Sequence, residues 1–206
     1  MIRSQILDGA LRPGAVVDQE ALARLLDLSS TPVREALRRL EAEGLLVQSA
    51  HRQTRVSALS RRELEEMYDV RLVLDPYAAK VGAGLAHGQE KQALKELLAS
   101  FDPASSYLEQ LQRNRDLHRI LYAASRNTVL VETLDGLWDR FDRYRAILIR
   151  EHMTASTAEE EHAAIVEAFI DGDGVAVSKL MRVHLARGRD AMLRHLGDSD
   201  FTVETG

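Results

Sequence analysis

The chain has 206 residues, of which 45% are hydrophobic and 29% charged, as expected for a globular protein of one or two domains. It contains no cysteine, which excludes disulfides and thiolate metal sites and fits a reducing compartment. No apolar stretch approaches the roughly 20 residues that span a bilayer, and the amino terminus lacks the apolar core of a signal peptide. We therefore expect a cytoplasmic protein with no membrane partner.

The charge is unevenly distributed along the chain. Residues 1–62 carry a net charge of +3 and residues 63–206 a net charge of −8. A basic front and an acidic back indicate two domains with different partners, although a difference of this size also arises by chance.

Residues 1–59 are predicted to form three short helices and a β-hairpin. Ile2, Ile6 and Leu7 share one helical face, and Asp18 is a plausible N-cap for a second helix with an apolar stripe at Leu22, Leu25 and Leu26. After the third helix, two short strands flank a turn. The expected elements are helices 2–8, 19–26 and 31–43 and strands 45–49 and 54–59.

The third helix has the clearest boundaries. Thr31 is predicted to cap it with Pro32 at the first helical position, where a missing N–H costs nothing, and Gly44 is predicted to end it. Apolar residues recur at steps of three and four, so one face should be buried. Those residues are Val33, Ala36, Leu37 and Leu40.

Residues 60–200 are predicted to form an all-helical bundle, and residues 201–206 a tail. Ser60 and Glu63 fit a capping box at the start of a long helix, and Pro76 within that helix predicts a kink. No strand-like alternation follows residue 60. The expected helices are 61–86, 89–100, 104–125, 128–151, 157–171 and 174–196, so the fold class is mainly α.

The second and third helices, joined by a tight turn, form a candidate helix-turn-helix. In this motif the start of the second helix lies in the major groove of DNA. Arg34 could pair with guanine, and Arg38, one turn later, would meet a phosphate. In the alternative, these arginines pair with Glu35, Glu41 and Glu43 on a solvated face. The candidate DNA contacts are Ser29, Ser30, Thr31, Arg34 and Arg38 in this motif and Arg52 and Arg55 in the hairpin.

At these residues the sequence resembles a known family. The string S-x-T-P-V-R-E-A-L-x-x-L-E-x-E-G-L, residues 29–45, resembles the winged helix-turn-helix of the GntR family of bacterial transcriptional regulators. The second half resembles the FCD-type effector domain of the FadR subgroup. The resemblance implies a homodimer that binds a palindromic operator in double-stranded DNA, expected to act as a repressor, and that responds to a small carboxylic acid in its helical domain.

Two positions depart from the family pattern. Ser30 stands where relatives often have a DNA-contacting arginine, and Gln53 stands where the wing usually has a glycine after Arg52. A glycine allows a tight turn and a close approach to the groove. We therefore expect operator binding to depend more on Arg34 than it does in relatives.

Three histidines lie beside apolar residues on separate predicted helices: His118, His162 and His184. Asn114, four residues before His118, shares its helical face. Neutral imidazole is a common ligand for divalent metals, but a single histidine in such a place is more often a hydrogen-bonded core residue. The residues alone leave both possibilities open.

The resemblance adds a metal site to this picture. Metal-binding members of the subgroup use Asp or Asn, then His four residues later, then two histidines on later helices, and Asn114, His118, His162 and His184 match that pattern. It implies a divalent metal, zinc first, with nickel or manganese as alternatives. For the effector, Arg71 matches an arginine that the subgroup places nearby.

Arg71 and Arg143 are thus the candidate effector-binding residues, with Arg145 as a further one. The alternative for each is a surface salt bridge, for Arg71 with Asp69 or Asp75. Two other functions compete with an acid-responsive regulator. One is a regulator that senses the metal itself. The other is a metal-dependent hydrolase, which the pattern disfavours because we see no general base beside the histidines and the helix-turn-helix would be unexplained.

Overall fold

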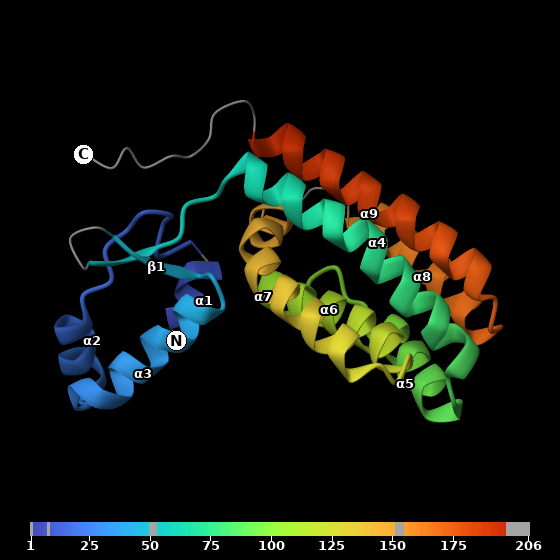
Figure 1. Ribbon diagram of the computed structural model, residues 1–206, viewed down its shortest axis with the longest axis horizontal. Coiled ribbons are helices and arrows are strands. Elements are labelled where there is room, and N and C mark those ends of the chain that lie inside the picture. The colour runs from blue at the N-terminus through green and yellow to red at the C-terminus, as the bar shows by residue number, and fades with distance from the viewer. Residues whose placement is uncertain (1, 8, 50–52, 151–154, 197–206) are drawn as a thin grey trace.

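The structure is a computed structural model that describes residues 2–7, 9–49, 53–150 and 155–196, with side chains except at 146–150, 155–157 and 195. The predicted fold class is confirmed: a helical front with a two-stranded hairpin is followed by a helical bundle (Figure 1). Among the described residues, no helix is long and apolar enough to cross a membrane. The predicted tail, 201–206, lies outside the described residues.

The front of the chain contains three helices packed beside the hairpin (Figure 1). These elements are α1 (Ile2–Leu7), α2 (Gln19–Leu26), α3 (Ser30–Ala42), β1 (Leu46–Gln48) and β2 (Thr54–Val56). The strands are antiparallel, with Leu46 opposite Val56. Apolar side chains of α1, α3 and both strands form one core, so the hairpin is held against the helix-turn-helix.

Helix α2 begins and ends where the sequence predicts. The Asp18 side chain accepts hydrogen bonds from the amides of Glu20 and Ala21, and Asp27 adopts a left-handed conformation with φ of 51°. The predicted apolar stripe of α2 is wrong at Leu25, which is 72% exposed. This short helix presents only part of its apolar side to the core.

The predicted cap of α3 is also wrong. Ser29 is the N-cap residue and the helix begins at Ser30, so Thr31 and Pro32 are its second and third residues. Proline is tolerated there because none of the first-turn amides has an acceptor within the helix. The far end agrees with prediction, since Gly44 follows the helix with φ of 72°. Three of the four apolar positions, Val33, Leu37 and Leu40, are buried, whereas Ala36 is exposed.

The second half is the predicted bundle. The longest contact runs along α4 and α9, which lie side by side, with α6 and α7 across from them (Figure 1). Helix α4 continues through Pro76. The six helices are α4 (Arg61–Leu85), α5 (Gly88–Ala99), α6 (Tyr107–Ala123), α7 (Thr128–Arg150), α8 (Ala155–Ile170) and α9 (Gly174–Leu196).

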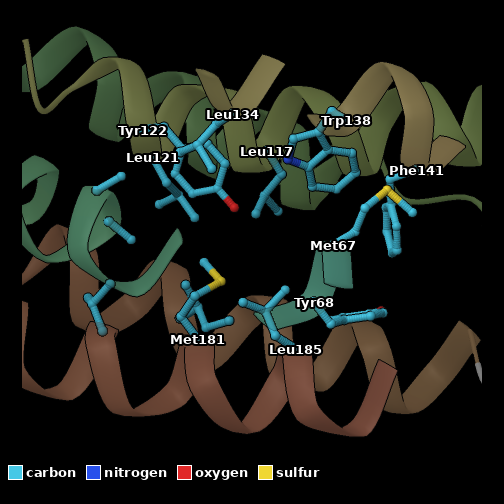
Figure 2. Packing of buried hydrophobic residues seen from close by; sticks show 14 of the residues in the cluster. Met67, Tyr68, Leu117, Leu121, Tyr122, Leu134, Trp138, Phe141, Met181 and Leu185 are labelled. Carbon is cyan, nitrogen blue, oxygen red and sulfur yellow. The ribbon is translucent and has the colours of Figure 1, made fainter. Parts of the chain in front are cut away.

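The bundle core brings α6 and α7 against α4 and α9. Figure 2 shows Leu117, Tyr122 and Trp138 on one side facing Met181 and Leu185 on the other. A close approach of α4 to α6 depends on Gly82, because a Cβ atom there would collide with the Leu121 carbonyl oxygen. The buried part of α6, which holds Asn114 and His118, therefore lies near α4.

The predicted capping box at the start of α4 forms only in half. The Ser60 hydroxyl accepts from the Glu63 amide, 3.3 Å away, but the Ser60 amide donates to the Tyr144 hydroxyl at 3.0 Å. The Glu63 carboxylate instead accepts from Tyr144, Arg140 and Arg143. Helix α7 thus supplies the missing part of the cap through Tyr144. It also ties the linker, residues 57–60 between β2 and α4, to the bundle.

The two halves contact each other through α1, α6 and α7. Arg3 of α1 lies 2.6 Å from Glu43, 3.5 Å from Asp139 and 3.0 Å from Asp142. Leu111 of α6 is buried in the front core. An ionic contact therefore joins the front of the chain to α7, and an apolar contact joins it to α6, which carries two of the predicted metal ligands.

Candidate metal centre and DNA-binding surface

The start of α3 forms an exposed polar surface. Ser29, Ser30, Thr31, Arg34 and Arg38 are all exposed, which leaves them accessible to a large partner. Within the described part of the chain, neither Arg34 nor Arg38 forms an ion pair. Hydroxyl groups and a helix N-terminus suit phosphate oxygens, and an unpaired guanidinium suits a base edge or a phosphate.

The alternative of a solvated ion-paired face is not supported. Glu43 pairs with Arg3 at 2.6 Å, and Glu41 accepts from Gln48 at 3.3 Å. Glu41 and Glu43 thus have partners other than Arg34 and Arg38.

Arg55 of the hairpin, a predicted DNA contact, forms hydrogen bonds within the protein. Its guanidinium donates to the Gly14 carbonyl oxygen at 3.0 Å and to the Gln53 side chain at 2.8 Å. These bonds fasten β2 to the loop before α2, so Arg55 supports the wing. Arg52 lies outside the described residues.

Three histidines converge inside the bundle. His118 of α6, His162 of α8 and His184 of α9 each offer a ring nitrogen, and these atoms lie within 4.8 Å of one another. His118 and His162 are each 1% exposed, and His184 is half-buried. Three imidazoles on separate helices can hold one divalent ion and leave positions for other ligands.

A buried hydrogen-bond chain orients His118. The Tyr122 hydroxyl donates to Asp75 at 2.7 Å, so it must accept from Nδ1–H of His118 at 2.8 Å. Burial and the neighbouring Asp75 raise the pKa of Tyr122 well above its usual value, which keeps this hydroxyl protonated. The lone pair of His118 is then on Nε2, which is buried and has no hydrogen-bond partner in the described residues. A buried acceptor of this kind needs an explanation, and a divalent metal ion is one that suits an imidazole lone pair.

A carboxylate orients His184. Its Nδ1 lies 2.8 Å from Glu161, whose other oxygen lies 2.5 Å from Arg187. Burial alone would raise the pKa of Glu161, but the hydrogen bond from His184 leaves that pKa below its usual value. An ionised acceptor places the His184 proton on Nδ1 and the lone pair on Nε2, the arrangement typical of metal-bound histidines.

The third histidine meets Asn114. The Asn114 amide nitrogen lies 2.9 Å from Nε2 of His162, while Arg145 donates to the Asn114 carbonyl oxygen. Nδ1 of His162 lies 3.5 Å from Glu159. The predicted oxygen ligand is thus beside the histidines but turned away: its amide nitrogen faces them, and its oxygen is held by Arg145.

The electrostatics keep the histidines in the form that binds metals. Burial, together with the neighbouring His184 and His162, lowers the pKa of His118 well below its usual value. Burial also lowers the pKa of His162 to about 4, although Glu159 opposes the shift. Both rings are neutral at pH 7, as ligation requires.

Arg71, a predicted effector-binding residue, has an acidic partner within the bundle. Arg71 is buried and pairs with Asp75 at 2.8 Å, and it stacks on Phe141 and Trp138. An ion pair with Asp75 was one predicted alternative, on the surface. In the structure this pair is buried, and Asp75 also accepts from the Tyr122 hydroxyl that contacts His118.

Arg143 does not lie with the histidines. It donates to the Ala58 carbonyl oxygen at 3.1 Å and to Glu63, at the linker. Arg145, the further candidate, is the arginine of α7 beside the site. The sequence could have distinguished Arg145 from Arg143 by its periodicity. Trp138, Phe141 and Arg145 follow each other at steps of three and four, so they share one helical face.

Two family models match the chain. The "FCD domain" model matches residues 66–187, and the model for "Bacterial regulatory proteins, gntR family" matches residues 1–56. The chain belongs to the GntR family and carries an FCD domain. Members of this family are DNA-binding transcriptional regulators, so the exposed start of α3 lies in the DNA-binding part.

Relatives of known sequence or structure agree with this assignment. A protein of Paenarthrobacter nicotinovorans named "Probable D-xylose utilization operon transcriptional repressor" is 30% identical over 206 residues, which cover 97% of this chain and 89% of that protein. The structure of Escherichia coli McbR/YncC has 22% identity, a TM-score of 0.78 and coverage of 95% of each chain.

A metal-bound structure has the same helical fold as the second half. The structure titled "Zn2+-bound FCD domain of TM0439, a putative transcriptional regulator" has 18% identity and a TM-score of 0.56, and the match covers 69% of this chain and all of that one. The zinc belongs to that protein, and the likeness concerns the fold.

Proposed function

We propose that this protein is a cytoplasmic, metal-dependent repressor whose operator binding is controlled by a small carboxylic acid. In this proposal, residues 1–59 bind a palindromic operator, and residues 60–200 hold a divalent metal, zinc first, together with the effector. The observation that carries it is the convergence of His118, His162 and His184, with two of the three rings turned so that a lone pair is available.

The donor set fits a divalent metal. Three neutral imidazole nitrogens suit zinc, with nickel and manganese as alternatives, and the buried Nε2 of His118 has no other partner in the described residues. When bound there, the ion supplies a Lewis-acid position that an anion can occupy. The residues of the chain orient the rings, exclude water and keep the imidazoles neutral.

Metal analysis tests this part of the proposal. The double variant His118→Ala, His162→Ala should contain far less than one metal ion per chain after purification. His87→Asn is the matched control because His87 is exposed and asparagine is well tolerated at a helix N-cap. Full metal occupancy in the double variant would disprove the site.

The DNA-binding part is tested at Arg34. Because this side chain is exposed and unpaired in the described residues, Arg34→Ala should remove specific operator binding and leave the fold intact. Lys179→Ala, which removes an exposed cation from α9 instead, should bind the operator as the unaltered protein does. Affinity should also fall steeply with salt, and a flat dependence would contradict phosphate contacts.

The homodimer is supported by an exposed apolar row on α4. Val70, Val73 and Tyr77 are 43%, 61% and 55% exposed and follow at steps of three and four. A palindromic operator requires two copies of the reading helix, so we propose that this row contacts a second copy. Val73→Glu should yield a monomer by light scattering, whereas Val129→Glu on α7 should not.

The two competing functions make different demands. A metal sensor would change its operator affinity on chelation without any acid, whereas the proposed regulator requires both metal and acid. A hydrolase would need a general base, but Glu161 is bound to His184 and Arg187, and Asp116 accepts from Gln112. These occupied carboxylates favour a regulator.

A further inference from the structure

Arg145 differs from the other arginines around the histidine cluster because it has no acidic partner. Arg71 pairs with Asp75 and Arg113 with Glu159. In the described residues, no carboxylate lies within ion-pair distance of Arg145, whose guanidinium donates to Asn114 and stands 5.8 Å from the ring centre of Trp138. Arg145 therefore has no direct ion pair within the described residues, and Asp142 and Glu159 act on its charge only from a longer distance.

A cation in this position needs an anion. An arginine guanidinium stays protonated in proteins, so Arg145 carries its charge at pH 7. Asp142 lies one turn earlier on α7, but it accepts from Arg3 and Arg115, each at 3.0 Å. A guanidinium has five N–H donors, and a single bond to Asn114 leaves most of them available.

Arg145 and the histidines lie at opposite ends of one amide group. The carbonyl oxygen of Asn114 faces Arg145, and its nitrogen faces Nε2 of His162 at 2.9 Å. The distance from the Arg145 guanidinium to Nε2 of His162 is thus about 5–7 Å, which is the length of an amide group plus a hydrogen bond on either side. While Asn114 stays in place, a single acid group cannot contact both Arg145 and a metal at the ring nitrogens. Two acid groups joined by a short chain can reach both.

We infer that the effector is a short dicarboxylic acid, with one acid group at the metal held by the three histidines and the other on Arg145. This inference rests on the proposed function and names its ligand more closely. Arg145 thereby takes the role that the sequence assigned to Arg143, and it determines the specificity for diacids over monoacids.

Calorimetric titration of the zinc-loaded full-length protein tests this inference. Succinate and butyrate have the same number of carbons and differ by one acid group. The unaltered protein should bind succinate at least tenfold more tightly than butyrate. This comparison needs no variant, so it holds even if a substitution at Arg145 prevents folding.

The variant Arg145→Gln should bind succinate only as tightly as butyrate, leave butyrate binding unchanged and keep its zinc. The matched control is Arg119→Gln, because Arg119 neighbours His118 in sequence but pairs with Asp135 at an exposed position. Equal binding of the two acids by the unaltered protein, or a succinate preference that survives Arg145→Gln, would overturn this inference alone. If neither acid bound while zinc and operator binding persisted, the acid-responsive function itself would be overturned.

Discussion

Tyr122→Phe is the sharpest test of how the bundle prepares its histidines. The substitution removes one oxygen atom from a buried chain in which Nδ1 of His118, the Tyr122 hydroxyl and Asp75 follow at 2.8 and 2.7 Å. Figure 2 shows this ring on α6 with its hydroxyl directed into the interior. Phenylalanine fills the same space, so the packing should be conserved.

The loss leaves one buried group without a partner and removes one hydrogen bond from another. The Nδ1–H of His118 has no other acceptor in the described residues, and Asp75 keeps only Arg71. The unsatisfied Nδ1–H costs about 1–3 kcal/mol and the lost hydrogen bond to the Asp75 carboxylate about 1.5–3 kcal/mol, so the metal-free protein should lose roughly 3–6 kcal/mol of its free energy of unfolding. The ring of His118 is also no longer held in place, and zinc affinity should fall about 10–100-fold.

Urea unfolding of the metal-free protein and a zinc competition titration measure these two quantities. Tyr68→Phe is the matched control, because Tyr68 is also buried in the bundle but its hydroxyl meets only Met192 Sδ at 3.7 Å. The control should cost less than about 1 kcal/mol and leave zinc affinity unchanged. If the two variants had equal stability and equal zinc affinity, the reasoning about the tautomer of His118 would be refuted.

Three further predictions concern the second histidine, the contact between the halves, and pH. Glu161→Gln should weaken zinc binding about tenfold or more in a competition titration, because an amide holds the ring of His184 less strongly than a carboxylate does. Arg3→Ala should lower the free energy of unfolding by about 1–2 kcal/mol in urea, since Asp142 is buried and loses one of its two cations. Burial lowers the pKa of His162 to about 4, so between pH 6.5 and 4 the unfolded chain binds more protons than the folded protein does. The free energy of unfolding of the metal-free protein should therefore decrease as the pH falls through that range.

Each of these predictions has a result that would contradict it. Glu160→Gln, at the exposed neighbouring position, should bind zinc normally, and equal weakening in both glutamate variants would point to a general charge effect. An unchanged unfolding midpoint in Arg3→Ala would show that the contact with α7 contributes nothing in solution. A flat profile from pH 6.5 to 4 in urea would mean that His162 is not buried as a neutral ring.

The helices could be predicted because their signals are local. Apolar periodicity, Gly44 and Asp18 determine element ends by contacts within one or two turns, and those elements formed as expected. The cap of α3 could not be settled in this way. Several residues in the run from Ser29 to Pro32 suit a helix start, and local chemistry does not choose among them.

The convergence of the histidines could not be derived from their spacing along the chain. It depends on how α6, α8 and α9 pack, and the expectation came from the family resemblance. Glu161, which holds His184, was not among the predicted site residues. One signal was local: Tyr122 follows His118 by four residues, a spacing that places both on one helical face.

The ionic contact of Arg3 also has a consequence for the order of events during synthesis. Arg3 and Asp142 are 139 residues apart in the chain, so Arg3 leaves the ribosome well before its partner. At a typical elongation rate of about 5–20 residues per second, α1 waits on the order of ten seconds for this partner. The front of the chain can form most of its own core before it docks, so its orientation on the bundle is fixed only after α7 has emerged.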